Sequence, residues 1–251
     1  MKKFGVISCS DDKKWGFSEA IISRYLEFFS LNSEQEQWVG FHATRGEVPL
    51  TEDLHKFDGF VISGSISSAN DNVEWIVKLL EFIRSAADLS KEKKRPKIVG
   101  ICFGHQLIAK ALGGKVGLNP DKDFVLQTEL IEVTIQAFEA ESIKGLFDKG
   151  PLRAVQSHGE CVVELPEGAV SLATSPTCKY EVVQYKENIL GFQCHPEMYA
   201  SEAEELILPH IAKSRKWDAI HVKKSSDSFK MECDYKEIIR VIVEYLNSTL
   251  V

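Results

Sequence analysis

The chain has 251 residues, of which 44% are hydrophobic and 27% charged, and its formal net charge at pH 7 is −7. This length predicts one large domain or two small ones, and the apolar content is enough for a full hydrophobic core. Because no internal repeat and no linker divides the sequence, we expect a single domain over residues 1–251. The acidic balance argues against nucleic acid or an anionic membrane as the main partner, and no apolar run reaches the ~18 residues of a membrane span.

The N-terminus shows no targeting segment, because Ser8, Ser10 and Asp11 interrupt its first apolar run. We therefore expect the protein in the cytosol. Its six cysteines are scattered without a CxxC pair, which fits neither a zinc site nor a disulfide framework. No metal and no cofactor is expected.

The first half of the chain alternates short apolar runs with amphipathic segments. The apolar runs predict strands at 4–7, 37–41, 58–63 and 97–101, of which 4–7 and 97–101 are expected to be buried. Apolar residues at helical spacing predict helices at 17–29, 73–85 and 103–112, with a shorter one inside 44–57. The basic segment 88–97 is predicted to be a solvated connection. Alternation of strand and helix predicts a parallel sheet with helices on both faces.

The second half is expected to add antiparallel strands at one side of this sheet. Strands are predicted at 113–117, 130–135, 152–156, 161–165, 169–174 and 180–185, and a last buried strand at 189–193. Two helices, roughly 201–215 and 234–247, are expected to close the chain. The segment 223–230 between them is predicted to be an exposed, mobile loop.

Residues 97–112, KIVGICFGHQLIAKAL, carry the strongest local signal. A strand turns sharply at Cys102 and continues as a helix, and Gly100 and Gly104 leave room for the turn. Such an elbow holds a nucleophile clear of the sheet, and the helix N-terminus favours a thiolate. A small buried cysteine packed under a helix would give the same local pattern.

A second group follows the last predicted strand, where His195 and Glu197 flank Pro196. A cysteine nucleophile needs a base, and the base needs an orienting acceptor. Alone, this triplet also fits a surface histidine. Together with the elbow it favours nucleophilic catalysis by Cys102, His195 and Glu197, because loops at the carboxyl ends of neighbouring strands meet.

The developing oxyanion is expected to be held by backbone N–H groups. The most natural donors are Phe103, which follows the nucleophile, and Gly64, in the small-residue loop after the third strand.

Two motifs resemble those of class I glutamine amidotransferases. GICFGHQ (100–106) resembles their Gly-x-Cys-x-Gly-x-Gln signature, and GFQCHPE (191–197) resembles their Gly-x-Gln-x-His-Pro-Glu. The resemblance implies an α/β, flavodoxin-like fold of three layers, with a mostly parallel central sheet flanked by helices and a small antiparallel sheet. It also implies Cys102 as the nucleophile, His195 as the base and Glu197 as the orienting carboxylate.

The resemblance extends to the substrate pocket. Gln106 matches the glutamine that helps to shape the γ-glutamyl pocket. Ser157 and His158 match a Ser-His-x-Asp segment that binds the α-amino-acid end of the substrate, with Glu160 where aspartate is usual. Many amidotransferases carry Gly-Gly-Pro in the oxyanion loop, whereas this chain carries Ser-Gly-Ser around Gly64.

Within the family, DGFVISGS (58–65) and EWIVKL (74–79) look most like the plant γ-glutamyl peptidases and related fungal stand-alone members. This implies hydrolysis of a γ-glutamyl amide bond of glutathione or its conjugates, through a γ-glutamyl thioester. The alternative is a glutaminase subunit that gives ammonia to a synthetase partner. A silent binding domain is a third hypothesis, which the intact Cys-His-Glu set disfavours.

Overall fold

The computed structural model describes residues 1–31, 34–89, 95–140, 143 and 150–248. Its centre is a nine-stranded sheet in the order β2-β1-β3-β4-β11-β10-β9-β6-β7. The first five strands of this order run parallel; they are β2 (Glu36–His42), β1 (Lys2–Ser8), β3 (Gly59–Ile62), β4 (Lys97–Ile101) and β11 (Ile189–Phe192).

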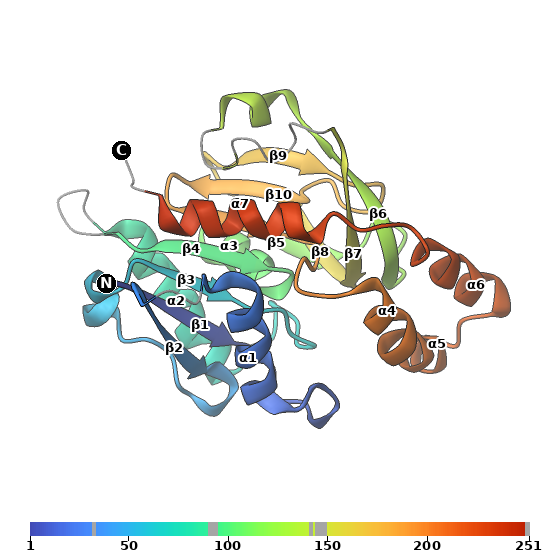
Figure 1. Cartoon of the computed structure of the whole chain (residues 1–251), viewed down its shortest axis with the longest axis horizontal. Helices are drawn as coiled ribbons and strands as arrows, with labels where there is room; N and C mark the ends of the chain where they lie inside the picture. The colour runs from blue at the N-terminus through green and yellow to red at the C-terminus, as the bar shows by residue number, and fades with distance from the viewer. Residues whose placement is uncertain (32–33, 90–94, 141–142, 144–149, 249–251) are drawn as a thin grey trace.

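Helices cover both faces of the parallel strands (Figure 1). One face carries α1 (Phe17–Phe29) and α7 (Tyr235–Asn247), and the other carries α2 (Glu74–Asp88) and α3 (Phe103–Ala111). Alternate residues of a strand point to opposite faces. Val61 of β3 accordingly joins the core under α1 and α7, whereas its neighbours Phe60 and Ile62 join the core under α2 and α3. These layers confirm the predicted three-layer α/β fold.

The second half extends the sheet with antiparallel strands, as predicted. These strands are β10 (Val182–Lys186), β9 (Val170–Thr174), β6 (Val125–Val133) and β7 (Leu152–His158). The small antiparallel sheet pairs β5 (Lys115–Leu118) with β8 (Glu160–Glu164). The remaining helical segments are η1 (Lys13–Trp15), η2 (Ala43–Arg45), η3 (Thr51–Lys56), η4 (Ile135–Glu139), α4 (Ala200–Glu202), the π-helical η6 (Ala203–Ile207), α5 (Leu208–Arg215) and α6 (Ala219–Ser228).

The prediction of a mobile loop at 223–230 is wrong, because α6 occupies most of it. Asp218 caps this helix by accepting the N–H groups of Ile220 and His221. The helix expected at 201–215 is interrupted by the π-helical η6. The strand expected at 130–135 already begins at Val125 and ends at Val133.

The connection predicted at 88–97 can be checked only at its ends, because residues 90–94 lie outside the described part of the chain. Lys97 also opens the predicted buried strand 97–101, and it follows that prediction: it is 3% exposed at the start of β4 and not part of a solvated connection. Its Nζ donates to the backbone oxygens of Tyr245, at 2.5 Å, and Ser248, at 2.7 Å. The lysine thus ties β4 to the end of α7.

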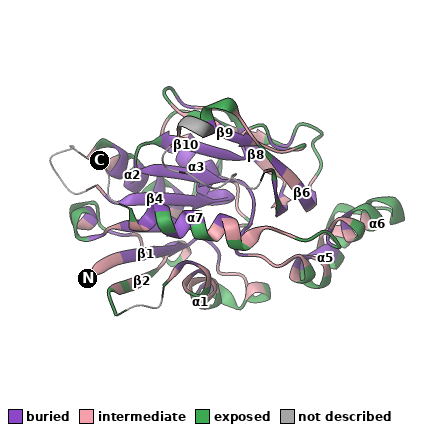
Figure 2. Cartoon of the chain, turned by 45° about the horizontal axis from the view of Figure 1, so that its top comes forward, coloured by how far each residue is buried: buried purple, intermediate pink, exposed green. Residues whose placement is uncertain are grey.

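Burial is concentrated in β1, β3, β4, β11 and α3, whereas α5 and α6 form an arm with a mostly exposed surface (Figure 2). Within the described part of the chain, none of the helices combines the length and apolar character that a bilayer span requires.

Candidate active site

The carboxyl ends of three neighbouring parallel strands meet at one edge of the sheet. Ile62 of β3 lies opposite Gly100 of β4, and Ile101 of β4 lies opposite Phe192 of β11. With this register, the loops that follow β3, β4 and β11 leave the sheet side by side. Segments that are far apart in sequence therefore contribute side chains to the same place.

Cys102 stands at a strained turn between β4 and α3. Its φ of 50° and ψ of −103° are unusual for a residue with a side chain. Gly100 and Gly104 make the turn possible: a Cβ on Gly100 would lie 2.5 Å from the Gly104 carbonyl carbon, and one on Gly104 would lie 2.4 Å from the Ile62 oxygen. The geometry is that of a nucleophile elbow.

His195 and Glu197 form a buried pair, at 7% and 5% exposure. Nδ1 of His195 lies 2.8 Å from Oε1 of Glu197. Burial alone would lower the pKa of His195, but the negative charges of Glu197 and of the Cys102 thiolate raise it well above its usual value. The surroundings therefore favour the imidazolium form of His195.

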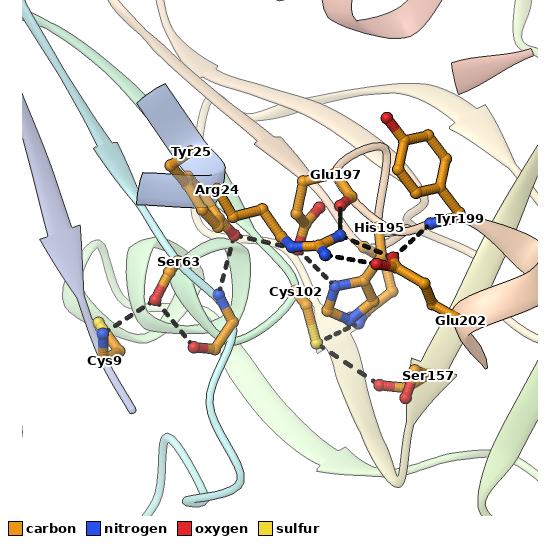
Figure 3. A network of polar contacts seen from close by, with 12 residues as sticks. Cys9, Arg24, Tyr25, Ser63, Cys102, Ser157, His195, Glu197, Tyr199 and Glu202 are labelled. Atoms are coloured by element: carbon orange, nitrogen blue, oxygen red, sulfur yellow. Dashed lines mark hydrogen bonds and ion pairs between the residues drawn. The ribbon is translucent and has the colours of Figure 1, made fainter. Parts of the chain in front are cut away.

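The sulfur of Cys102 is surrounded by polar groups. Figure 3 shows the His195 ring facing it. Nε2 of Gln193 lies 3.5 Å from Sγ, and the Ser157 oxygen lies 3.9 Å from it. Gln193 is fully buried, and its Oε1 accepts a hydrogen bond from Gln106 at 3.2 Å. An amide N–H directed at a sulfur stabilises the thiolate form.

Gly64 packs directly against this group. A Cβ added to it would lie 3.0 Å from Cε1 of His195 and 3.8 Å from Cβ of Cys102. Its backbone N–H donates to the hydroxyl of Tyr25 at 3.3 Å. Phe103 begins α3, so its N–H belongs to the first turn, where a helix leaves N–H groups without intrahelical partners.

The residues expected to bind substrate lie around the same edge. Nε2 of Gln106 donates to the backbone oxygen of Glu160 at 2.7 Å, which joins α3 to β8. His158 is 3% exposed, and its Nδ1 lies 2.8 Å from Oδ1 of Asn119. Burial lowers the pKa of His158 to about 3, so its ring is neutral at physiological pH. The Glu160 carboxylate accepts a hydrogen bond from Ser68 at 2.6 Å.

Three residues around this site were missed from the sequence. Gln193 had a sequence signal, because it lies inside the GFQCHPE motif, two residues before His195. Arg24 and Tyr25 had no such signal. Nη1 of Arg24 donates to the backbone oxygen of Glu197 at 2.9 Å, and the Tyr25 hydroxyl donates to the Glu197 carboxylate at 3.1 Å.

The site supplies acid–base and nucleophilic groups. It combines a thiol at an elbow, an imidazole fixed by a carboxylate, and backbone N–H groups nearby. Among the residues that the structure describes, no three His, Cys, Asp or Glu side chains are arranged to hold a metal ion. The arrangement is that of an α/β enzyme with a cysteine at its nucleophile elbow.

Comparison with known proteins identifies the family. The family described as glutamine amidotransferase class-I matches residues 23–213. The chain is 41% identical to γ-glutamyl peptidase 4 of Arabidopsis thaliana over 167 residues, which cover 66% of this chain and 64% of that protein. It is 31% identical to γ-glutamyl peptidase 2 of the same plant over 235 residues, which cover 92% and 89%.

The fold comparison agrees. The crystal structure of a glutamine amidotransferase from Thermotoga maritima superposes with a TM-score of 0.68 and 17% identity, covering 98% of this chain and 99% of that one. The chain belongs to the class I glutamine amidotransferase family, as its motifs predicted, and it is an enzyme of this type.

Proposed function

We propose that the protein is a γ-glutamyl peptidase that cleaves the γ-glutamyl amide bond of glutathione or of its conjugates. The observation that carries this proposal is the Cys102 sulfur facing an imidazole whose Nδ1 lies 2.8 Å from Glu197. The kinship with plant γ-glutamyl peptidases supports the choice of substrate.

The first half of the proposed reaction forms a thioester. The Cys102 thiolate attacks the γ-carbonyl carbon, and a C–S bond forms as the carbonyl oxygen becomes an oxyanion. The His195 imidazolium then gives its Nε2 proton to the leaving nitrogen while the C–N bond breaks. Glu197 holds the ring and balances its positive charge before this transfer.

In the second half, water attacks the thioester. Neutral His195 takes a proton from this water, the C–S bond breaks, and glutamate and the Cys102 thiolate are released. The charge on the carbonyl oxygen needs backbone N–H donors in both halves, and one such donor typically contributes ~3 kcal/mol. We propose Phe103 as one donor, and Gly64 as the second once bound substrate draws its N–H away from the Tyr25 hydroxyl, to which it donates in this structure.

Substrate contacts are proposed for the residues around the sulfur. Gln106 fixes the wall of the γ-glutamyl pocket through its hydrogen bond to the Glu160 oxygen. Ser157 and His158, at the end of β7, are proposed to face the α-amino-acid end of the substrate. Glu160 offers a carboxylate for the α-amino group, one methylene longer than the aspartate usual in the family.

Glutamate release from the purified protein tests the proposal. Wild-type protein is incubated separately with glutathione, a glutathione S-conjugate and glutamine, with Cys102→Ala as the inactive control. We expect release from glutathione or the conjugate to exceed release from glutamine, and a γ-glutamyl adduct on the Cys102 peptide in mass spectra of quenched reactions.

Other outcomes would contradict the peptidase. Preferential glutamine hydrolysis would indicate the ammonia-donating subunit of a synthetase instead. No release from any substrate, with Cys102 unreactive to iodoacetamide, would indicate a silent domain that only keeps the fold.

A further inference from the structure

The Tyr25 hydroxyl lies between the catalytic carboxylate and the loop after β3 (Figure 3). It donates to Oε1 of Glu197 at 3.1 Å and accepts the Gly64 N–H at 3.3 Å. Tyr25 is 2% exposed, so water cannot readily replace either hydrogen bond. One phenol on α1 therefore joins two segments that the proposed chemistry needs.

Oε1 of Glu197 receives two contacts, from His195 Nδ1 at 2.8 Å and from Tyr25. Oε2 is buried and has no hydrogen-bond partner among the described residues. The phenol is thus the second group, besides the imidazole, that fixes the orientation of this carboxylate. A hydrogen bond to a buried carboxylate also disperses its negative charge.

The preceding residue fixes the backbone of the same glutamate. Arg24 Nη1 donates to the Glu197 oxygen at 2.9 Å, and the guanidinium is held by Glu202 through contacts of 2.5 and 2.7 Å. Two consecutive residues of α1 therefore hold the main chain and the side chain of Glu197. Arg24 and Tyr25 together therefore restrict both the backbone and the side chain of Glu197.

We propose that Tyr25 is a positioning residue: its hydroxyl holds the Glu197 carboxylate against His195 and ties this carboxylate to the Gly64 loop. The inference rests on the proposed function, in which Glu197 and Gly64 serve the reaction. Burial, and then the Glu197 charge, raise the pKa of Tyr25 well above its usual value, so the phenol keeps the proton that it donates.

Removal of the Tyr25 hydroxyl should change the pKa of His195. Without the Tyr25 hydrogen bond, the charge of Glu197 acts more strongly on His195 and stabilises its imidazolium. The other titratable and charged groups that face this pair are Cys102, His158, Cys194 and Arg24. These groups are unchanged in a Tyr25→Phe variant. A shift in the pH profile of this variant therefore measures the effect of the Tyr25 hydroxyl on the pKa of His195.

The test compares Tyr25→Phe with Tyr185→Phe. Tyr185 is also a buried tyrosine, but its hydroxyl contacts His105, away from Glu197. Both variants keep their aromatic rings, and the ring of Tyr25 continues to pack on Phe29. Melting temperatures are measured for both, so that loss of stability is separated from loss of function.

We expect kcat of Tyr25→Phe to fall about tenfold with KM within about twofold, because the hydroxyl supports reacting groups rather than substrate. The alkaline limb of kcat/KM should move up by ~0.5–1 pH unit. Tyr185→Phe should leave the profile in place. An alkaline limb that stays in place in Tyr25→Phe, or that moves as far in Tyr185→Phe, would overturn the proposal.

Alkylation of Cys102 by iodoacetamide provides a readout that needs no substrate. The alkaline step in its rate marks the loss of the imidazolium beside the thiolate, and it should also move up in Tyr25→Phe. If wild-type protein releases no glutamate, the proposed function fails, while this step still decides the role of Tyr25. If turnover occurs but neither profile moves, Tyr25 only packs.

Discussion

The close approach of α3 to β3 makes Gly104 a sensitive position. A Cβ added here would lie 2.4 Å from the backbone oxygen of Ile62 and 3.0 Å from its carbonyl carbon. Ordinary contacts begin at 3.4 Å, so Gly104→Ala requires helix and strand to separate by about 1 Å. Both partners are backbone in buried elements, and no flexible side chain can yield instead.

Two effects of this substitution oppose each other in stability. Alanine is favoured over glycine in a helix by ~1 kcal/mol. Overpacking a buried contact costs ~1–3 kcal/mol. The net change should be a loss on the order of 1 kcal/mol in the free energy of unfolding, because the clash outweighs the propensity gain.

Activity should suffer more than stability. Cys102 and Phe103 are carried by the first turn of α3, and a displacement of ~1 Å between reacting groups costs on the order of 100-fold in rate. We therefore expect kcat/KM of Gly104→Ala to fall about 100-fold, measured by glutamate release.

The matched control is Gly117→Ala in β5. A Cβ there would lie 3.4 and 3.6 Å from the Val163 methyl groups, which is ordinary contact. Its unfolding free energy in urea should stay within ~0.5 kcal/mol of wild type, with full activity. Wild-type activity and stability in Gly104→Ala would refute the claim that the elbow depends on this close approach.

Three further predictions concern titratable groups. Cys102→Ala should abolish glutamate release, whereas Cys194→Ala should largely retain it; equal losses would mean that the wrong sulfur was assigned. Glu197→Gln should lower kcat/KM on the order of 10³–10⁴-fold and move its alkaline limb to lower pH, because the amide no longer supports the raised pKa of His195. An unmoved limb in Glu197→Gln would contradict that electrostatic role. Burial raises the pKa of Glu181 from 4.5 to about 7 in the folded protein. The unfolded chain therefore releases this proton more easily, and the free energy of unfolding should fall as pH rises from about 4.5 to 7. Glu181→Gln should remove this dependence, worth at most about 3 kcal/mol, in unfolding measured across that pH range.

Local sequence patterns predicted the secondary structure of those segments whose conformation depends mainly on their own residues. The parallel strands and α1, α2, α3 and α7 follow from apolar spacing, because a buried face needs apolar residues at the period of its element. The elbow at Cys102 follows from flanking glycines. Helix α6 was missed, because its exposed, polar surface lacks an apolar stripe, although Asp218 provides an N-cap.

The sequence alone therefore determined the fold class, the family and the identity of Cys102, His195 and Glu197 as candidates, since motifs keep reactive side chains at fixed local spacing. Only the tertiary structure decided their surroundings. Tyr25 contacts Gly64 and Glu197 across 39 and 172 residues of sequence, and Gln193 reaches the sulfur of a residue 91 positions away. Such contacts arise from the register of β3, β4 and β11 and from the packing of α1 beside them, which no local pattern encodes.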